Sequence, residues 1–127
     1  MKDKLIKRAE SLVDLVVSDP RWNLQDELLI QVFGFTLYGY LFGLGRLVLT
    51  MDVDVIDEVA SEQLVKLGIG NQYADGLVRD AFTAFSSKNE KDIHFQLVSI
   101  GHSYFSSDNL VKCVDSIFNN TDALRNS

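Results

Sequence analysis

The feature that most constrains the fold is an uncharged, apolar run from Leu28 to Gly45. No Asp, Glu, Lys or Arg interrupts these residues, and Arg46 is the first charge after them. A helix that is hydrophobic nearly all round must be buried, either in the core of a protein or in a membrane. The rest of the chain must therefore cover this segment, unless lipid does.

Both environments are compatible with part of the pattern. Gly39 and Gly43 have the small-xxx-small spacing of packed membrane helices. However, the run has only about the minimum length of a membrane span, and Gln31 and Thr36 lower its hydrophobicity. Because the neighbouring segments have the amphipathic pattern of soluble helices, we favour a buried central helix whose glycines let other helices approach closely. A transmembrane helix is the alternative.

The start of the central helix is predicted at Asn23. Asn is a favoured N-cap residue, and Asp26 and Glu27 then lie in the first turn, where negative charge is stabilising. The same pattern predicts an end near Leu49. Trp22, just before the cap, either packs against the helix start or stays exposed as a binding anchor, and we favour packing.

Five further helices follow from apolar residues at helical spacing. The first ends at Ser18-Asp19-Pro20; the third begins near Asp52 or Asp54 and ends at Gly68 and Gly70. The remaining three begin at Asn71, at Asn89 and at Ser107 or Asp108. The predicted inward-facing residues are Leu5, Ala9, Leu12, Val13 and Val16; Ile56, Val59, Ala60, Leu64 and Leu67; Tyr73, Leu77, Ala81, Ala84 and Phe85; Ile93, Leu97, Ile100 and Tyr104; and Leu110, Val114, Ile117 and Phe118.

No segment sustains the period-two alternation of a strand. With 127 residues, 46% of them hydrophobic, the chain is long enough for one sizeable core. We therefore predict an all-α, single-domain bundle over residues 1–127, with five or six helices around a long apolar central helix. The polar residues from about Asn119 onward are expected to form a frayed tail.

Charge and cysteine content limit the partners and the compartment. A formal net charge of -6 disfavours binding to nucleic-acid phosphates and to anionic membranes. The single cysteine, Cys113, excludes an intramolecular disulfide, and Glu10 and Asp14 interrupt what would be the apolar region of a signal peptide. We expect a cytoplasmic protein.

The negative charge is concentrated in one window, from Met51 to Gln63. This window carries five acids and no Lys or Arg, so it accounts for -5 of the net -6. Acids are ordinary in a first helical turn and on a solvated face, but an ordinary face mixes both signs. We therefore predict that the window binds a basic partner through Asp52, Asp54, Asp57, Glu58 and Glu62.

No pattern typical of catalysis or metal binding is present. The acids lack the spacing of a calcium loop, and His94 and His102 would lie about 12 Å apart along one helix. Cys113 has no local partner that would make it a nucleophile, and exposed carboxylates stay ionised at neutral pH. We expect no enzyme activity, no metal and no cofactor.

Three classes of function are then open. The first is a protein that inhibits or sequesters a basic partner, and the second is a small-molecule module with Tyr38, Tyr40 and Phe42 as pocket walls. The third is an enzyme whose His94, His102 or Cys113 meets its partners only in the folded chain. The acidic window favours the first class, and self-association through the central helix also stays open.

In overall character, as a small, acidic, all-α chain without a catalytic signature, the protein resembles bacterial immunity proteins of polymorphic toxin systems, including contact-dependent growth inhibition. The resemblance implies a cognate toxin domain as partner, often a nuclease with a basic cleft. Asp54, Glu58 and Glu62, one turn apart, would then replace phosphates as partners for the Lys and Arg side chains of the toxin.

Overall fold

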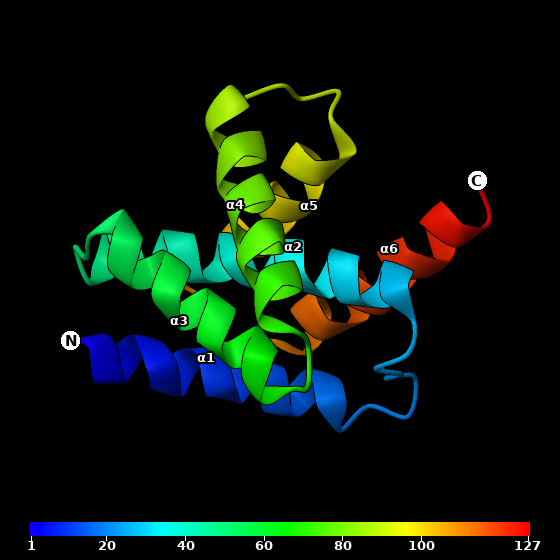
Figure 1. Cartoon of the computed structure of the whole chain (residues 1–127), viewed down its shortest axis with the longest axis horizontal. Helices are drawn as coiled ribbons and strands as arrows, with labels where there is room; N and C mark the ends of the chain where they lie inside the picture. Colours follow the sequence, from blue (N-terminus) through cyan, green and yellow to red (C-terminus); the bar gives the residue numbers. More distant parts are fainter.

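The protein is a bundle of six α-helices without strands (Figure 1). A computed structural model describes all residues, 1–127. The helices are α1 (Lys2–Val17), α2 (Glu27–Gly43), α3 (Val53–Lys66), α4 (Asn71–Ser87), α5 (Ile93–His102) and α6 (Val111–Arg125), and α2 continues into a π-helical turn, η1 (Leu44–Val48). The predicted all-α bundle around a long apolar helix is confirmed.

Helix α2 is the centre of the bundle. Thirteen of its 17 residues are buried, and it contacts all five other helices, α5 most extensively. In Figure 1, α1 runs along one side of it and α4 crosses it. Glu27–Val48 is long and apolar enough to cross a membrane, but 83% of its most apolar window is buried inside the bundle. This burial supports the core-helix interpretation.

Glycines bring α2 and α5 into backbone contact. A Cβ atom on Gly39 would overlap the carbonyl oxygen of Val98, and one on Gly101 would overlap that of Thr36. A Cβ on Gly45 would lie 2.6 Å from the Ile56 side chain of α3. The glycines of the central helix therefore let its neighbours approach closely, as predicted.

Two helix starts differ from the predictions in the same way. Asp26, not Asn23, caps α2 by accepting a bond of 3.2 Å from the amide of Leu29. Asp92, not Asn89, caps α5 by accepting a bond of 3.0 Å from the amide of His94. Each Asn instead closes a turn by accepting a bond from the amide two residues later. Such Asx turns compete with capping for the same side-chain oxygen.

The last helix is displaced toward the C-terminus. It begins at Val111 rather than at Ser107 or Asp108, because the side chain of Asn109 accepts a bond from the amide of Val111. It also continues to Arg125, so the residues from Asn119 do not form the expected frayed tail. Thr121 is buried and Arg125 forms an ion pair with Asp26, which fixes this end to the start of α2.

The core is one cluster of 32 buried side chains. Trp22 packs against it, with its ring edge-on to Phe33 at a centroid distance of 5.5 Å, which confirms the predicted packing interaction. Tyr73 and Ile93 were predicted to face inward, but 40% and 39% of their surfaces are exposed. Both residues lie in the first turn of their helices, beyond the area that the neighbouring helices cover.

Candidate binding surface

Helix α3 presents three acids on one exposed face. It buries Ile56 and Val59 against α1, α2 and α4, and this leaves Asp54, Glu58 and Glu62 exposed, one turn apart, as predicted. Asp52 is also exposed, and it precedes the helix without forming a capping bond. Four of the five predicted acids are therefore exposed.

Asp57 differs from the other four because it is half-buried. The hydroxyl of Tyr38, a core residue of α2, donates a bond of 2.6 Å to its carboxylate. Burial raises the pKa of Asp57, the negative charge of Asp54 raises it further, and the bond from Tyr38 opposes both effects. Asp57 is therefore less solvated than the exposed carboxylates of this window.

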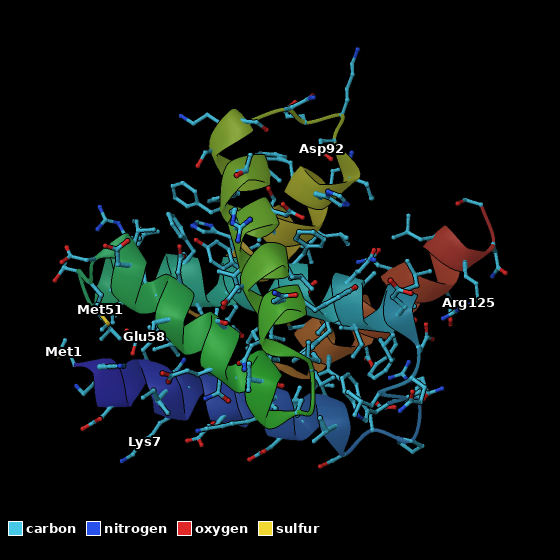
Figure 2. All side chains as sticks on the ribbon, viewed as in Figure 1. Met1, Lys7, Met51, Glu58, Asp92 and Arg125 are labelled. Atoms are coloured by element: carbon cyan, nitrogen blue, oxygen red, sulfur yellow. The ribbon has the colours of Figure 1, made fainter.

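The window is not free of cations once the chain is folded. The Lys2 ammonium of α1 lies 2.6 Å from the Glu58 carboxylate. Figure 2 shows Glu58 facing the end of α1 at which Met1 is labelled. The bond from Lys2 lowers the pKa of Glu58. Lys66, the first cation after the window in the sequence, lies 3.9 Å from Glu10.

A groove between α3 and α4 extends the acidic surface. Asp75 of α4 joins it, because Ser61 of α3 donates a hydrogen bond to the Asp75 carboxylate. The groove comprises two adjoining hollows of about 470 and 390 Å³ that share Glu58, Ser61 and Asp75. The larger hollow is also lined by Asp54, Asp57, Val78, Arg79 and Phe82. We call this hollowed surface the α3/α4 groove.

The contribution of α4 to this surface was not predicted from the sequence. Asp75, Arg79 and Phe82 recur at intervals of four and three residues, which places them on one edge of α4. Phe82 keeps 37% of its surface exposed. The spacing was available in the sequence, but nothing in the sequence indicated that this edge of α4 faces α3.

The side chains considered for catalysis do not meet. His94 is exposed, while burial among aromatic rings, including those of Phe85 and Phe105, lowers the pKa of His102. Cys113 is buried, which raises the pKa of its thiol to about 12. These three side chains form no hydrogen bond with one another, and no group of three or more His, Cys, Asp or Glu side chains is arranged to hold a metal ion.

The aromatic residues considered as pocket walls belong to the packed core. Tyr38 and Tyr40 have no exposed surface. Their hydroxyls are used within the protein, since Tyr38 donates to Asp57 and Tyr40 accepts a bond of 3.1 Å from the Arg8 guanidinium. Phe42 packs edge-on against Phe85. These rings stabilise the bundle instead of lining a cavity.

Comparison with known proteins adds no relative. The chain matches no protein-family model, no curated protein and no solved structure.

Proposed function

We propose that this chain is an immunity protein that neutralises a basic toxin domain by placing the α3/α4 groove over the substrate cleft of the toxin. The observation that carries the proposal is the composition of the groove. In its larger hollow, four carboxylates, those of Asp54, Asp57, Glu58 and Asp75, accompany one cation, Arg79. Carboxylates form strong, directional bonds with Arg and Lys, so they can replace the phosphates of a nucleic-acid substrate.

The negative charge of the groove would mainly speed the association with the toxin and orient the two proteins. The window from Met51 to Gln63 carries most of the net charge, and a concentrated patch of one sign steers an oppositely charged partner into contact. Phe82 adds an exposed aromatic surface inside the same hollow, and aromatic residues often contribute much of the binding energy of an interface. The groove thus offers both an electrostatic and an apolar contribution.

The acids of the groove differ in how free they are to bind. Asp57 is held by Tyr38 and has a fixed position, whereas Glu58 is already paired with Lys2. Asp54 and Glu62 form no ion pair within the chain. Asp54 and Glu62 are therefore the residues at which charge reversal breaks no ion pair within the chain.

The first experiment is affinity purification of the tagged chain from the soluble fraction of its native cells, at low and at high salt. We expect a stoichiometric basic protein, whose toxicity the chain suppresses when the two are co-expressed. A partner without toxicity, or no partner at either salt concentration, would contradict the proposal. Recovery only from membranes would assign α2 to a bilayer and contradict the cytoplasmic location that the proposal requires.

The second experiment compares two variants of equal net charge. Asp54→Lys/Glu62→Lys reverses two acids of α3, whereas Glu90→Lys/Asp108→Lys reverses two exposed acids that lie outside the groove. We expect the α3 variant to associate with the toxin at least about tenfold more slowly at low salt, with a smaller difference at high salt. Equal slowing in both variants would show that only total charge matters and would refute the role of the groove.

A further inference from the structure

A second hollow lies on the other side of α4, away from the α3/α4 groove. It is open to solvent, has a volume of about 290 Å³ and is lined by residues of α2, α4 and α5. The residues that line it include Gln31 and Phe35 of α2, Tyr73, Gly76 and Asp80 of α4, and His94 of α5. We call it the α2/α4/α5 pocket.

Three of the side chains that line this pocket are aromatic: Phe35, Tyr73 and His94. The His94 ring stacks on Phe35 with a centroid distance of 4.5 Å and an interplanar angle of 19°. The amide of Gln31 donates a bond of 3.3 Å to the hydroxyl of Tyr73. Tyr73 is the residue that was predicted to be buried and instead keeps 40% of its surface exposed. The exposed ring of Tyr73 lines the same pocket as the stacked Phe35 and His94 rings, and such aromatic surfaces allow a flat ligand to stack.

Gly76 is a glycine inside α4 that packing does not explain. A glycine in the middle of a helix destabilises the helix relative to alanine. Gly34, Gly39, Gly43, Gly45 and Gly101 offset that cost by allowing close packing, because a Cβ at any of them would meet a neighbour at less than 3.0 Å. At Gly76 a Cβ would meet nothing within 4 Å. Packing therefore does not require this glycine, and Gly76 lines the pocket.

The charge of the pocket selects the class of ligand. Asp80 is the one acidic residue that lines it, it forms no ion pair, and no Lys or Arg lines the pocket. Aromatic rings and a carboxylate together favour a cation that carries a flat apolar group. The volume is at the lower end for small-molecule sites, which limits the ligand to about one ring system.

We propose that the α2/α4/α5 pocket binds a small arylalkylamine, with the ring against Tyr73 and the backbone at Gly76 and with the ammonium group facing Asp80. This site is separate from the α3/α4 groove. The proposal therefore stands or falls independently of the toxin-binding function.

Two probes that share a ring and differ in charge test the proposal. Tryptamine carries an ammonium group, whereas indole-3-acetate carries a carboxylate on a similar side chain. Each is added to the intact, ¹⁵N-labelled chain, and amide chemical shifts are followed. We expect tryptamine to shift the amides of Gln31, Gly76 and His94 saturably, with a Kd of about 1 mM or lower. Indole-3-acetate should bind at least about tenfold more weakly.

Two substitutions locate the binding. Asp80→Asn should remove most of the preference for tryptamine over indole-3-acetate. Gly76→Ala should weaken tryptamine binding at least about fivefold while raising the melting temperature, so that misfolding cannot explain the loss. Gly70→Ala is the matched control, because a Cβ there also meets nothing and Gly70 does not line the pocket. It should bind tryptamine as the wild type does.

Three results would overturn the proposal. The absence of saturable shifts with tryptamine would show that the pocket does not bind this class of ligand. Equal binding of both probes would contradict the role of Asp80. Unchanged tryptamine binding by Gly76→Ala would place the bound ring elsewhere on the protein.

Discussion

The same substitution, glycine to alanine, is expected to have opposite effects at different positions along this chain. Alanine has the higher helix propensity, so each replacement inside a helix gains roughly 0.5–1 kcal/mol before packing is considered. The sign of the net effect then depends on what the new methyl group meets. Gly39, Gly34 and Gly76 form a graded series in this respect.

At Gly39 the new methyl group would meet backbone. It would overlap the carbonyl oxygen of Val98 and lie 2.8 Å from the amide nitrogen of His102. Backbone atoms inside a helix cannot rotate away, so α5 would have to move off α2 at the most extensive helix contact of the bundle. Overpacking of this kind costs about 1–3 kcal/mol, and we take the upper end because the obstacle is rigid. The net loss for Gly39→Ala is then about 2 kcal/mol.

The other two positions give smaller or opposite effects. At Gly34 the methyl group would lie 2.5 Å from a terminal carbon of Leu77, a flexible side chain that can shift. The cost of that shift should roughly cancel the gain in helix propensity. At Gly76 nothing opposes the gain, so Gly76→Ala should stabilise the protein by about 0.5–1 kcal/mol.

Thermal unfolding followed by circular dichroism measures the series. For a domain of this size, 1 kcal/mol corresponds to roughly 4 °C in melting temperature. We expect Gly39→Ala to melt about 8 °C below the wild type, Gly34→Ala close to it, and Gly76→Ala about 2–4 °C above it. If Gly39→Ala were as stable as Gly76→Ala, the reasoning from backbone contact between α2 and α5 would be refuted.

Four further predictions concern the candidate binding surface and the buried thiol. Tyr38→Phe should destabilise the protein by about 1 kcal/mol, because it removes the hydrogen bond to Asp57. Since that bond lowers the pKa of Asp57, an NMR titration of the variant should show this pKa raised further. An unchanged pKa would contradict the assignment of the bond. Since the pKa of Asp57 is raised in the folded state, the contribution of Asp57 to the free energy of unfolding should fall as the pH rises above 3.8. Asp57→Asn should remove this pH dependence from urea unfolding curves. Cys113 should react with a thiol reagent at pH 8 only when the chain unfolds, and rapid labelling of the native protein would refute its burial. Lys2→Ala should leave the fold intact and speed association with a basic partner by freeing Glu58, and slower association would mean that Lys2 itself contacts the partner.

The central helix could be predicted from the sequence because the absence of charge is a local property. No arrangement of the other helices would let the residues from Leu28 to Gly45 face water, so the bundle had to form around them. The exposed stripe of Asp54, Glu58 and Glu62 follows in the same way from the apolar residues between them. Both inferences use only the period of one helix.

The first residues of the helices were harder to predict, because Asn and Asp are equally good N-cap residues. In the two segments that begin at Asn23 and Asn89, an Asp follows three residues later, and either residue could cap a helix. In both, the Asn accepts a bond from the amide two residues on and closes a turn, and the Asp then caps the helix. The choice depends on the path of the chain before the helix, which propensity does not describe.

The surroundings of the acids could not be predicted, because they depend on how other helices pack against α3. Lys2 lies 56 residues before Glu58 and Asp75 lies 14 residues after Ser61, yet both pairs form bonds. Such pairs leave no pattern in one sequence. The folded chain is therefore less purely acidic beside α1 than the sequence alone indicated, and beside α4 the groove gains both an acid, Asp75, and a cation, Arg79.

The geometry of α4 makes the two proposed sites separable by experiment. One edge of the helix, with Asp75 and Phe82, lines the α3/α4 groove, and another, with Gly76 and Asp80, lines the α2/α4/α5 pocket. The buried stripe of α4 lies against α2, α3 and α5 and fixes both edges to the core. Because no residue lines both sites, Asp80→Asn should change probe binding without changing toxin association at high salt, where its charge is screened. A change in toxin association that persisted at high salt would show that the partner covers both edges of α4.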